Sequence, residues 1–214
     1  MAHIESVNVG VARPTGVKSG TSGIDKHPQA DTIAIDVPGF GRSGLAGDAI
    51  CDTPNHGGPD QAVYAYARED LDGWAAELDR PLRAGLFGEN LTTVGVDVTG
   101  AVIGERWRVG DSLVLQVTCP RTPCVTFAEQ LGEPGWIKRF TRAAVPGAYL
   151  RVLEPGAVRA GDAIVVEGRP DSPATIGVSF RAITLEPDLL VDLVDAPDLV
   201  PEMRERARRR VALA

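Results

Sequence analysis

Two cysteines in the stretch CPRTPC are separated by four residues and could act as metal ligands, a redox pair or one reactive thiol. The apolar alternation over residues 113–117 predicts a strand whose buried face continues to Cys119, so we expect this thiol to be buried and inert. Cys124 precedes a possible helix at 127–131. A thiol at a helix N-terminus beside Arg121 should have a lowered pKa, so the two cysteines are predicted to differ.

Two further stretches place polar side chains in turns beside strand-like runs. His56 lies in DTPNHGGPDQAV, where Gly57 and Gly58 would let the backbone approach another group closely. Glu89 and Asn90 lie in GLFGENLTTVG, ahead of the strand-like run NLTTV. Each stretch also has an alternative without a function. The first could be an ordinary turn with an exposed histidine, and the second a β-turn followed by a strand.

A zinc site is the main rival to a single reactive thiol. Cys51-x4-His56 and Cys119-x4-Cys124 together form a Cys3His set, a composition that binds structural Zn²⁺. Such a site would require Cys119 to leave the apolar face of its strand. A disulfide is disfavoured, because an odd number of cysteines and an N-terminus unlike a signal peptide indicate a cytoplasmic protein with reduced thiols.

Composition restricts the partners. The net charge of −7 over 214 residues disfavours nucleic acid and leaves anionic ligands only where bases cluster locally. No apolar run approaches the roughly 18 residues of a membrane span, so we expect neither a nucleic-acid nor a membrane partner. The run RERARRR is interpreted as a solvated helix end, with a nucleic-acid patch as the alternative.

Short strand-like runs separated by Gly and Pro dominate the first two-thirds of the chain and predict a barrel or sandwich. Helical spacing appears at 71–78, and more weakly at 127–131 and 136–142. After the linker-like GRPDSPAT, the pattern fits two or three short helices. We therefore predict a mostly β domain with helices over residues 1–168 and a small helical extension over residues 175–214.

The stretch PGFGRSG contains the pattern G-x-G-x-x-G after the strand-like run IAIDV. A dinucleotide site also needs a helix that begins within this motif, because the helix N-terminus binds the pyrophosphate. The following LAGDAICDTPNHGG has no helical period. We therefore interpret these glycines as turn residues.

Three stretches in this order and separation resemble the MOSC domain, a family named for the C-terminal domain of molybdenum-cofactor sulfurases: HGGPDQAVYAY, FGENLTTVG and IGERWRVGDSLVLQVTCPRTPC. GLAGDAICD and SGIDKHP resemble two further family elements, and the resemblance covers about residues 5–168. The helical tail resembles the three-helix extension of stand-alone bacterial members, a branch associated with detoxification of N-hydroxylated purines.

The resemblance implies a β-barrel fold and a pterin-bound molybdenum cofactor. It implies that Cys124, which closes the PRxPC motif, is the metal ligand and that His56 and Arg121 contact the oxo groups or the pterin. It also implies that Glu89 and Asn90 orient the cofactor or substrate. The residues implied to neutralise the cofactor phosphate are Lys26, Lys18 and Ser22.

The resemblance also implies an enzyme that reduces N-hydroxylated compounds (N-hydroxylaminopurines, amidoximes or hydroxylamines) to amines. No flavin, haem or iron–sulfur motif is visible, so a separate flavoprotein reductase is expected to donate electrons. The chain lacks the longer N-terminal half of the eukaryotic amidoxime-reducing relatives, which implies a more exposed cofactor. Two alternatives stay open: a sulfur carrier with a persulfide on Cys124, and a non-catalytic domain with the zinc site described above.

Overall fold

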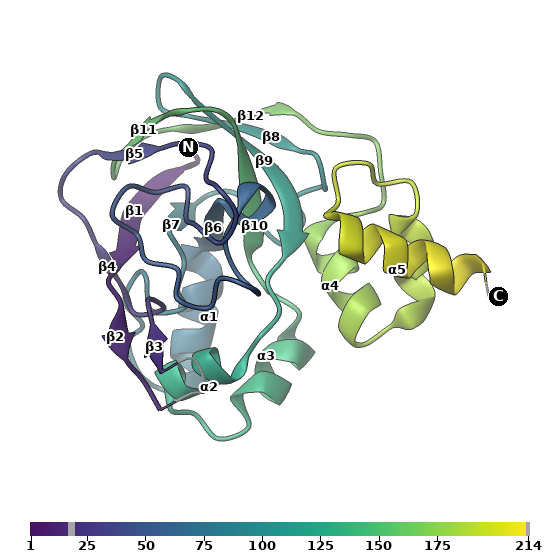
Figure 1. Cartoon of the computed structure of the whole chain (residues 1–214), viewed down its shortest axis with the longest axis horizontal. Helices are drawn as coiled ribbons and strands as arrows, with labels where there is room; N and C mark the ends of the chain where they lie inside the picture. The colour runs from purple at the N-terminus through teal and green to yellow at the C-terminus, as the bar shows by residue number, and fades with distance from the viewer. Residues whose placement is uncertain (17–19, 213–214) are drawn as a thin grey trace.

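The computed structural model describes residues 1–16 and 20–212 (Figure 1). It contains an eight-stranded sheet with the order β12-β8-β9-β10-β6-β7-β1-β4, and two small sheets that pair β5 with β11 and β2 with β3. The strands are β1 (His3–Gly10), β2 (Arg13–Pro14), β3 (Thr21–Ser22), β4 (Lys26–Pro28), β5 (Ile33–Ile35), β6 (Val63–Ala67), β7 (Leu91–Val94), β8 (Arg106–Val109), β9 (Leu113–Pro120), β10 (Ala148–Glu154), β11 (Gly156–Val158) and β12 (Ile164–Gly168).

The large sheet is antiparallel except where β6 pairs with β7. Parallel neighbours need a crossover connection, and α1 (Arg68–Leu78) forms part of it. The residue after α1 is Asp79, which caps the helix with a φ of 49° in the left-handed region. Its backbone N–H donates to the Ala75 carbonyl. The predicted helix at 71–78 is therefore confirmed and begins three residues earlier.

The prediction of a β-barrel is wrong. Within the part of the chain that the structure describes, the large sheet ends at β12 on one side and β4 on the other, and these strands do not pair. β1 still reaches the segment before β12, because His3 bridges Ala163 and the Ile4 N–H donates to the Asp162 carbonyl at 2.9 Å. The sheet therefore curls back on itself without a continuous ladder. The broader prediction of a mostly β chain with helices agrees with the structure.

β9 lies in the centre of the sheet, and all eight of its residues are buried. Alternation predicted only one buried face, but α4 (Ile176–Thr184), η1 (Pro59–Gln61) and β11 also pack against this strand. Cys119 is fully buried near its end, and burial raises the pKa of the thiol to about 12. The prediction of an inert core thiol is confirmed.

A cluster of aromatic side chains fixes the helices below the sheet. It joins α1 and the turn before β7 to α2 (Val125–Leu131) and α3 (Trp136–Ala143). The ring centroids of Phe87 and Phe127 lie 5.1 Å apart, and those of Trp74 and Trp136 lie 4.7 Å apart. Because buried aromatic pairs stabilise by packing as well as area, this cluster holds the start of α2 in place.

Three helical segments follow the sheet: α4, the 3₁₀ helix η2 (Pro187–Leu193) and α5 (Pro201–Ala212). Figure 1 shows α4 and α5 together beside β9. Apolar side chains of all three segments belong to the same buried cluster as the sheet, including Ile176, Leu193 and Ala207. None of the described helices is long and apolar enough to cross a membrane.

The glycine motif after β5 forms turns and irregular structure, with no α-helix between Asp36 and Gly58. Gly41 has a φ of 66°, in the region that favours glycine. A Cβ at Gly57 would lie 2.7 Å from the Arg42 carbonyl oxygen, so the two halves of this loop pack closely. The interpretation of these glycines as turn residues is confirmed.

Candidate active site

A pocket that is open to solvent lies between the N-terminal segment, the loop that follows β5 and the start of α2. Most of the residues predicted from the sequence line it: Ser22, Lys26, His56, Asn90, Arg121 and Cys124. Lys18 lies outside the described residues, and Glu89 is not among the lining residues.

Cys124 is the N-terminal cap residue of α2 and is half-buried. Burial alone would raise the pKa of its thiol, but a hydrogen bond with His56 and the positive charge of Arg121 lower it to about 7. A hydrogen bond from the Phe127 backbone N–H, in the first turn of α2, also lowers this pKa, so the helix N-terminus contributes beside the two side chains. The predicted contrast between Cys119 and Cys124 is confirmed.

Arg121 follows β9 and is almost fully buried. Its guanidinium carbon lies 3.9 Å from the centre of the Phe127 ring and 5.2 Å from that of Tyr64. Its Nη1 donates to the Phe87 carbonyl at 2.6 Å. A guanidinium held by two rings and one carbonyl presents a fixed positive charge beside Cys124.

Lys26 is buried in the pocket wall and pairs with Asp48. Burial lowers the pKa of Lys26, and the carboxylate of Asp48 acts in the opposite direction. Asp48 also accepts from the Gly10 N–H at 2.8 Å and from Asn90 Nδ2 at 2.9 Å. Much of the charge of Lys26 is therefore already balanced, so Arg121 is the stronger site for an anion.

Asn90 and Glu89 position other groups. Asn90 Oδ1 accepts from the Tyr64 N–H at 3.1 Å, which links β6 to the pocket wall. The Glu89 carboxylate is fully buried and accepts from the Phe87 N–H at 3.1 Å and from Thr92 Oγ1 at 2.9 Å. Glu89 therefore stabilises the turn whose Phe87 carbonyl accepts from Arg121, and its expected role in orienting the cofactor or substrate stays a prediction.

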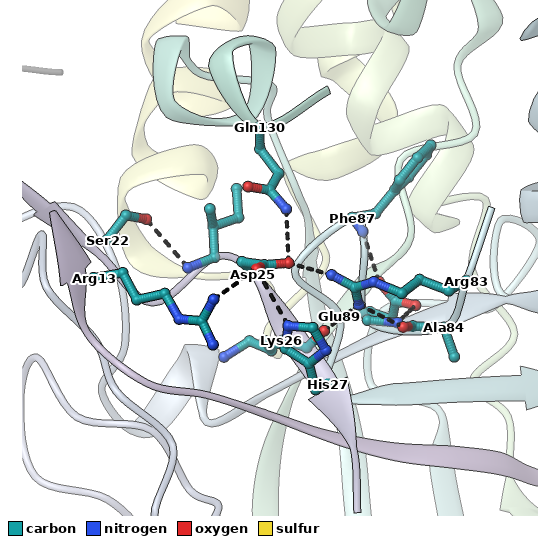
Figure 2. A network of polar contacts seen from close by, with 12 residues as sticks. Arg13, Ser22, Asp25, Lys26, His27, Arg83, Ala84, Phe87, Glu89 and Gln130 are labelled. Atoms are coloured by element: carbon teal, nitrogen blue, oxygen red, sulfur yellow. Dashed lines mark hydrogen bonds and ion pairs between the residues drawn. The ribbon is translucent and has the colours of Figure 1, made fainter. Parts of the chain in front are cut away.

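A polar network is centred on Asp25, which lies in the chain between the pocket-lining residues Ile24 and Lys26 (Figure 2). Its carboxylate accepts from Arg83, from Gln130 Nε2 at 3.0 Å and from His27 at 3.2 Å, and it lies 3.7 Å from Arg13. Burial raises the pKa of Asp25, but these partners lower it below the ordinary value. Because Gln130 belongs to α2, the network ties the segment before β4 to the helix that follows the reactive thiol.

Ser22 is also a lining residue, and its Oγ accepts from the Ile24 N–H at 3.1 Å. Figure 2 shows this contact at the edge of the Asp25 network. The hydroxyl shapes the loop before β4. Its predicted contact with a cofactor phosphate stays a prediction.

The zinc hypothesis fails on the positions of its ligands. Cys119 belongs to the core cluster around β9, whereas Cys51, His56 and Cys124 line the pocket. Among the described residues, no group of three or more His, Cys, Asp or Glu side chains is placed to bind a metal ion. A single thiolate can still bind a metal whose other ligands come from a cofactor.

Some pocket residues were not predicted from the sequence. Gln61, Tyr64 and Tyr149 line the pocket, and Asp48 pairs with the lining residue Lys26. The Gly-Asp pair within GLAGDAICD was the one available signal for Asp48. Gln61 and Tyr64 lie within the stretch HGGPDQAVYAY, but no role was predicted for either.

The fold and the pocket define a class of protein with a reactive thiol that closes a PRxPC loop. The model of the MOSC domain matches residues 52–165, and the chain belongs to this family. The uncharacterised protein YflK of Bacillus subtilis is 38% identical over 160 residues, covering 75% of this chain and 70% of YflK. The crystal structure of YiiM from Geobacillus stearothermophilus superposes with a TM-score of 0.80 at 28% identity, covering 99% of this chain and 100% of that one.

A protein of Gibberella moniliformis named "Reductase" is 32% identical over 161 residues. The match covers 72% of this chain but only 28% of the fungal protein, so this chain corresponds to a part of that relative. These similarities confirm the family predicted from the sequence.

Proposed function

We propose that the protein is a molybdenum-cofactor-dependent reductase that converts N-hydroxylated compounds to amines. The observation that carries the proposal is the thiol of Cys124, with a pKa of about 7, in a pocket that also holds the buried guanidinium of Arg121. Membership in a molybdenum-cofactor-binding family and similarity to a protein named as a reductase support it.

The donor set of the pocket fits this cofactor. A soft thiolate suits molybdenum, and one protein sulfur is sufficient where the pterin dithiolene provides two more. The pocket is open to solvent, and its wall carries Arg121 for the anionic parts of the cofactor. Cys124 would hold the metal, and Lys26, Ser22 and Asn90 would contact the pterin or its phosphate.

When bound, the cofactor would supply the two-electron oxygen-transfer chemistry that the side chains lack. Cys124 is presented as a thiolate near neutral pH because His56 and Arg121 stabilise its charge. His56 can hold or release a proton at its imidazole nitrogens beside the thiol, and Arg121 stabilises negative charge from a fixed position. A separate flavoprotein reductase would return two electrons after each turnover.

The test is to produce the full chain in a host that synthesises the cofactor, and to measure molybdenum by elemental analysis. The purified protein should contain molybdenum and reduce benzamidoxime with a chemical electron donor. A Cys124→Ser variant should lose both, whereas Cys51→Ser, a change in the same pocket, should keep both. A Cys124→Ser variant that retains molybdenum and activity would refute the proposal.

A sulfur-transfer role is the second candidate, and the same low pKa of Cys124 favours it, because a thiolate at neutral pH can carry a persulfide. Mass spectrometry of metal-free protein distinguishes the two. One added sulfur on Cys124, together with no molybdenum uptake, would support sulfur transfer over reduction.

A further inference from the structure

A second cavity, the outer groove, adjoins the cofactor pocket. It measures about 920 Å³, is open to solvent and lies between the loop over residues 53–61, Phe40 and the start of α5. Three residues line both cavities, namely His56, Gly57 and Gln61. A small molecule in the outer groove would therefore lie next to the imidazole that binds the reactive thiol.

The two cavities differ in charge. In the cofactor pocket Lys26 is paired with Asp48, so Arg121 provides the positive charge that suits an anion. Among its described lining residues, the outer groove has the carboxylates of Asp60 and Glu202 and no Lys or Arg. Asp60 pairs with Arg151 at 2.7 Å, whereas Glu202 is exposed at the groove. The outer groove is thus suited to neutral ligands and repels anions.

The outer groove has an apolar, partly aromatic lining. Phe40 is 82% exposed, although it is one of the largest apolar side chains. Met203 and Val200 extend the apolar surface from the side of the helical extension. An exposed ring beside a polarizable thioether offers a face on which a flat aromatic ligand can stack.

Gln61 carries an unused acceptor at the junction of the two cavities. Its Oε1 is buried and has no hydrogen-bond partner among the described residues. Buried polar atoms are nearly always paired in folded proteins, so this acceptor needs a partner that the described residues do not provide, either a ligand donor or an ordered water. An amide oxygen accepts N–H or O–H donors, which amidoximes and N-hydroxylated amines carry.

We propose that the outer groove is the substrate site and that it selects flat, uncharged aromatic compounds whose N–H or O–H group donates to Gln61. Phe40 and Met203 contact the ring, and Glu202 disfavours carboxylate analogues. The substrate class rests on the reductase function proposed above. The position of the site rests on the two cavities and the orphan acceptor alone.

The two methionines make a direct test possible. Met1 is fully exposed at the chain end and Met203 lines the groove, so ¹³C-methyl-methionine labelling gives one reporter signal and one internal control. The cofactor-free full chain is titrated with benzamidoxime, with acetamidoxime, which lacks the ring, and with benzoate, which replaces the neutral group by an anion. Benzamidoxime should shift the Met203 signal in a saturable way and leave Met1 unchanged.

The controls test each part of the groove. Gln61→Leu should weaken benzamidoxime binding roughly tenfold, because it removes one hydrogen bond. Phe40→Ala should weaken it several-fold, and because Phe40 is exposed, this variant does not depend on core packing. Val37→Ala, an exposed apolar change in the same segment but outside the groove lining, should have no effect. Acetamidoxime and benzoate should bind at least tenfold more weakly.

The outcomes separate the two proposals. If the protein takes up molybdenum and reduces benzamidoxime, but the Met203 signal does not move and Gln61→Leu leaves the KM unchanged, the groove proposal is wrong and the reductase function stands. If the Met203 signal shifts as expected but molybdenum is never incorporated, the groove stands and the reductase function fails. Equal binding of benzoate would overturn the proposed selectivity.

Discussion

The lowered pKa of Cys124 predicts how fast this thiol is alkylated at each pH. With a pKa of about 7 it is about half thiolate at pH 7, whereas a thiol with the ordinary value of 9.0 is about 1% thiolate. The thiolate fraction is thus about fifty-fold larger, but each thiolate reacts about eightfold more slowly, because a thiolate of lower pKa is a weaker nucleophile. Cys124 should therefore react roughly sixfold faster than an equally accessible ordinary thiol at pH 7 and roughly eightfold slower at pH 10.

The assay is iodoacetamide labelling of the cofactor-free chain from pH 5 to pH 10, with each cysteine followed by peptide mass spectrometry. Cys124 should show a midpoint near pH 7, and Cys119 should stay unlabelled while the protein is folded, because its thiol is buried and its pKa is raised to about 12. The pH midpoint of alkylation does not depend on how easily iodoacetamide reaches the thiol, because limited access lowers the rate by the same factor at every pH.

The role of His56 is tested in the same assay. His56→Asn removes the imidazole that lowers the pKa of Cys124, while burial continues to raise this pKa and Arg121 to lower it, so the midpoint should rise above 7. His3→Asn is the matched control, since His3 contacts the Met1 carbonyl away from the pocket. A midpoint near 9.0 in the unmodified chain, or an unchanged midpoint in His56→Asn, would refute this account of the site.

Two further predictions concern stability and the loop that carries His56. Burial, and then the charges of Asp97 and Glu69, raise the pKa of Asp70 to about 6, so folding disfavours its ionised form. The resulting loss of stability is absent below pH about 4, where the carboxyl is protonated in both states, and complete above the folded pKa. Asp70→Asn should therefore raise the free energy of unfolding in urea by about 1–2 kcal/mol at pH 8 but not at pH 3. Gly57→Ala should displace His56, because glycine there has a φ of 78° and a Cβ would lie 2.7 Å from a carbonyl oxygen. Alkylation should then show a raised midpoint for Cys124. Gly73→Ala, on an open face of α1, is the control and should leave this midpoint unchanged.

The sequence predicted local elements better than their arrangement. Alternation at 113–117 identified β9, and helical spacing at 71–78 identified α1. Strand order depends on contacts between distant segments, so short strands could not distinguish a barrel from the curled sheet. Pro120 pairs with Ala148 as the last residue of β9, a position that proline can take in a sheet.

The site was predictable where motifs are continuous in the chain. The resemblance carried by the stretches with CPRTPC and HGG grouped Cys124, Arg121 and His56, and all three line one pocket. The ion pair of Lys26 with Asp48 was missed because the two residues are 22 positions apart and meet only in the folded chain. The predicted division into residues 1–168 and 175–214 stays a prediction, although the two parts share one apolar core.

The position of β1 has a consequence for how the chain reaches its folded state. This first strand pairs with the short β4 soon after it, but its longer partner β7 and the residues 161–164 that bond to its beginning are synthesised much later. At about 5–20 residues per second, the roughly 160 residues between Ile4 and its Asp162 partner take about 8–30 s to translate. Until then, the beginning of β1, which carries the buried apolar residue Ile4, lacks part of its pairing. A newly made chain thus exposes an incompletely paired apolar strand for seconds, and its yield in cells should depend on translation speed and on chaperones that cover its N-terminus.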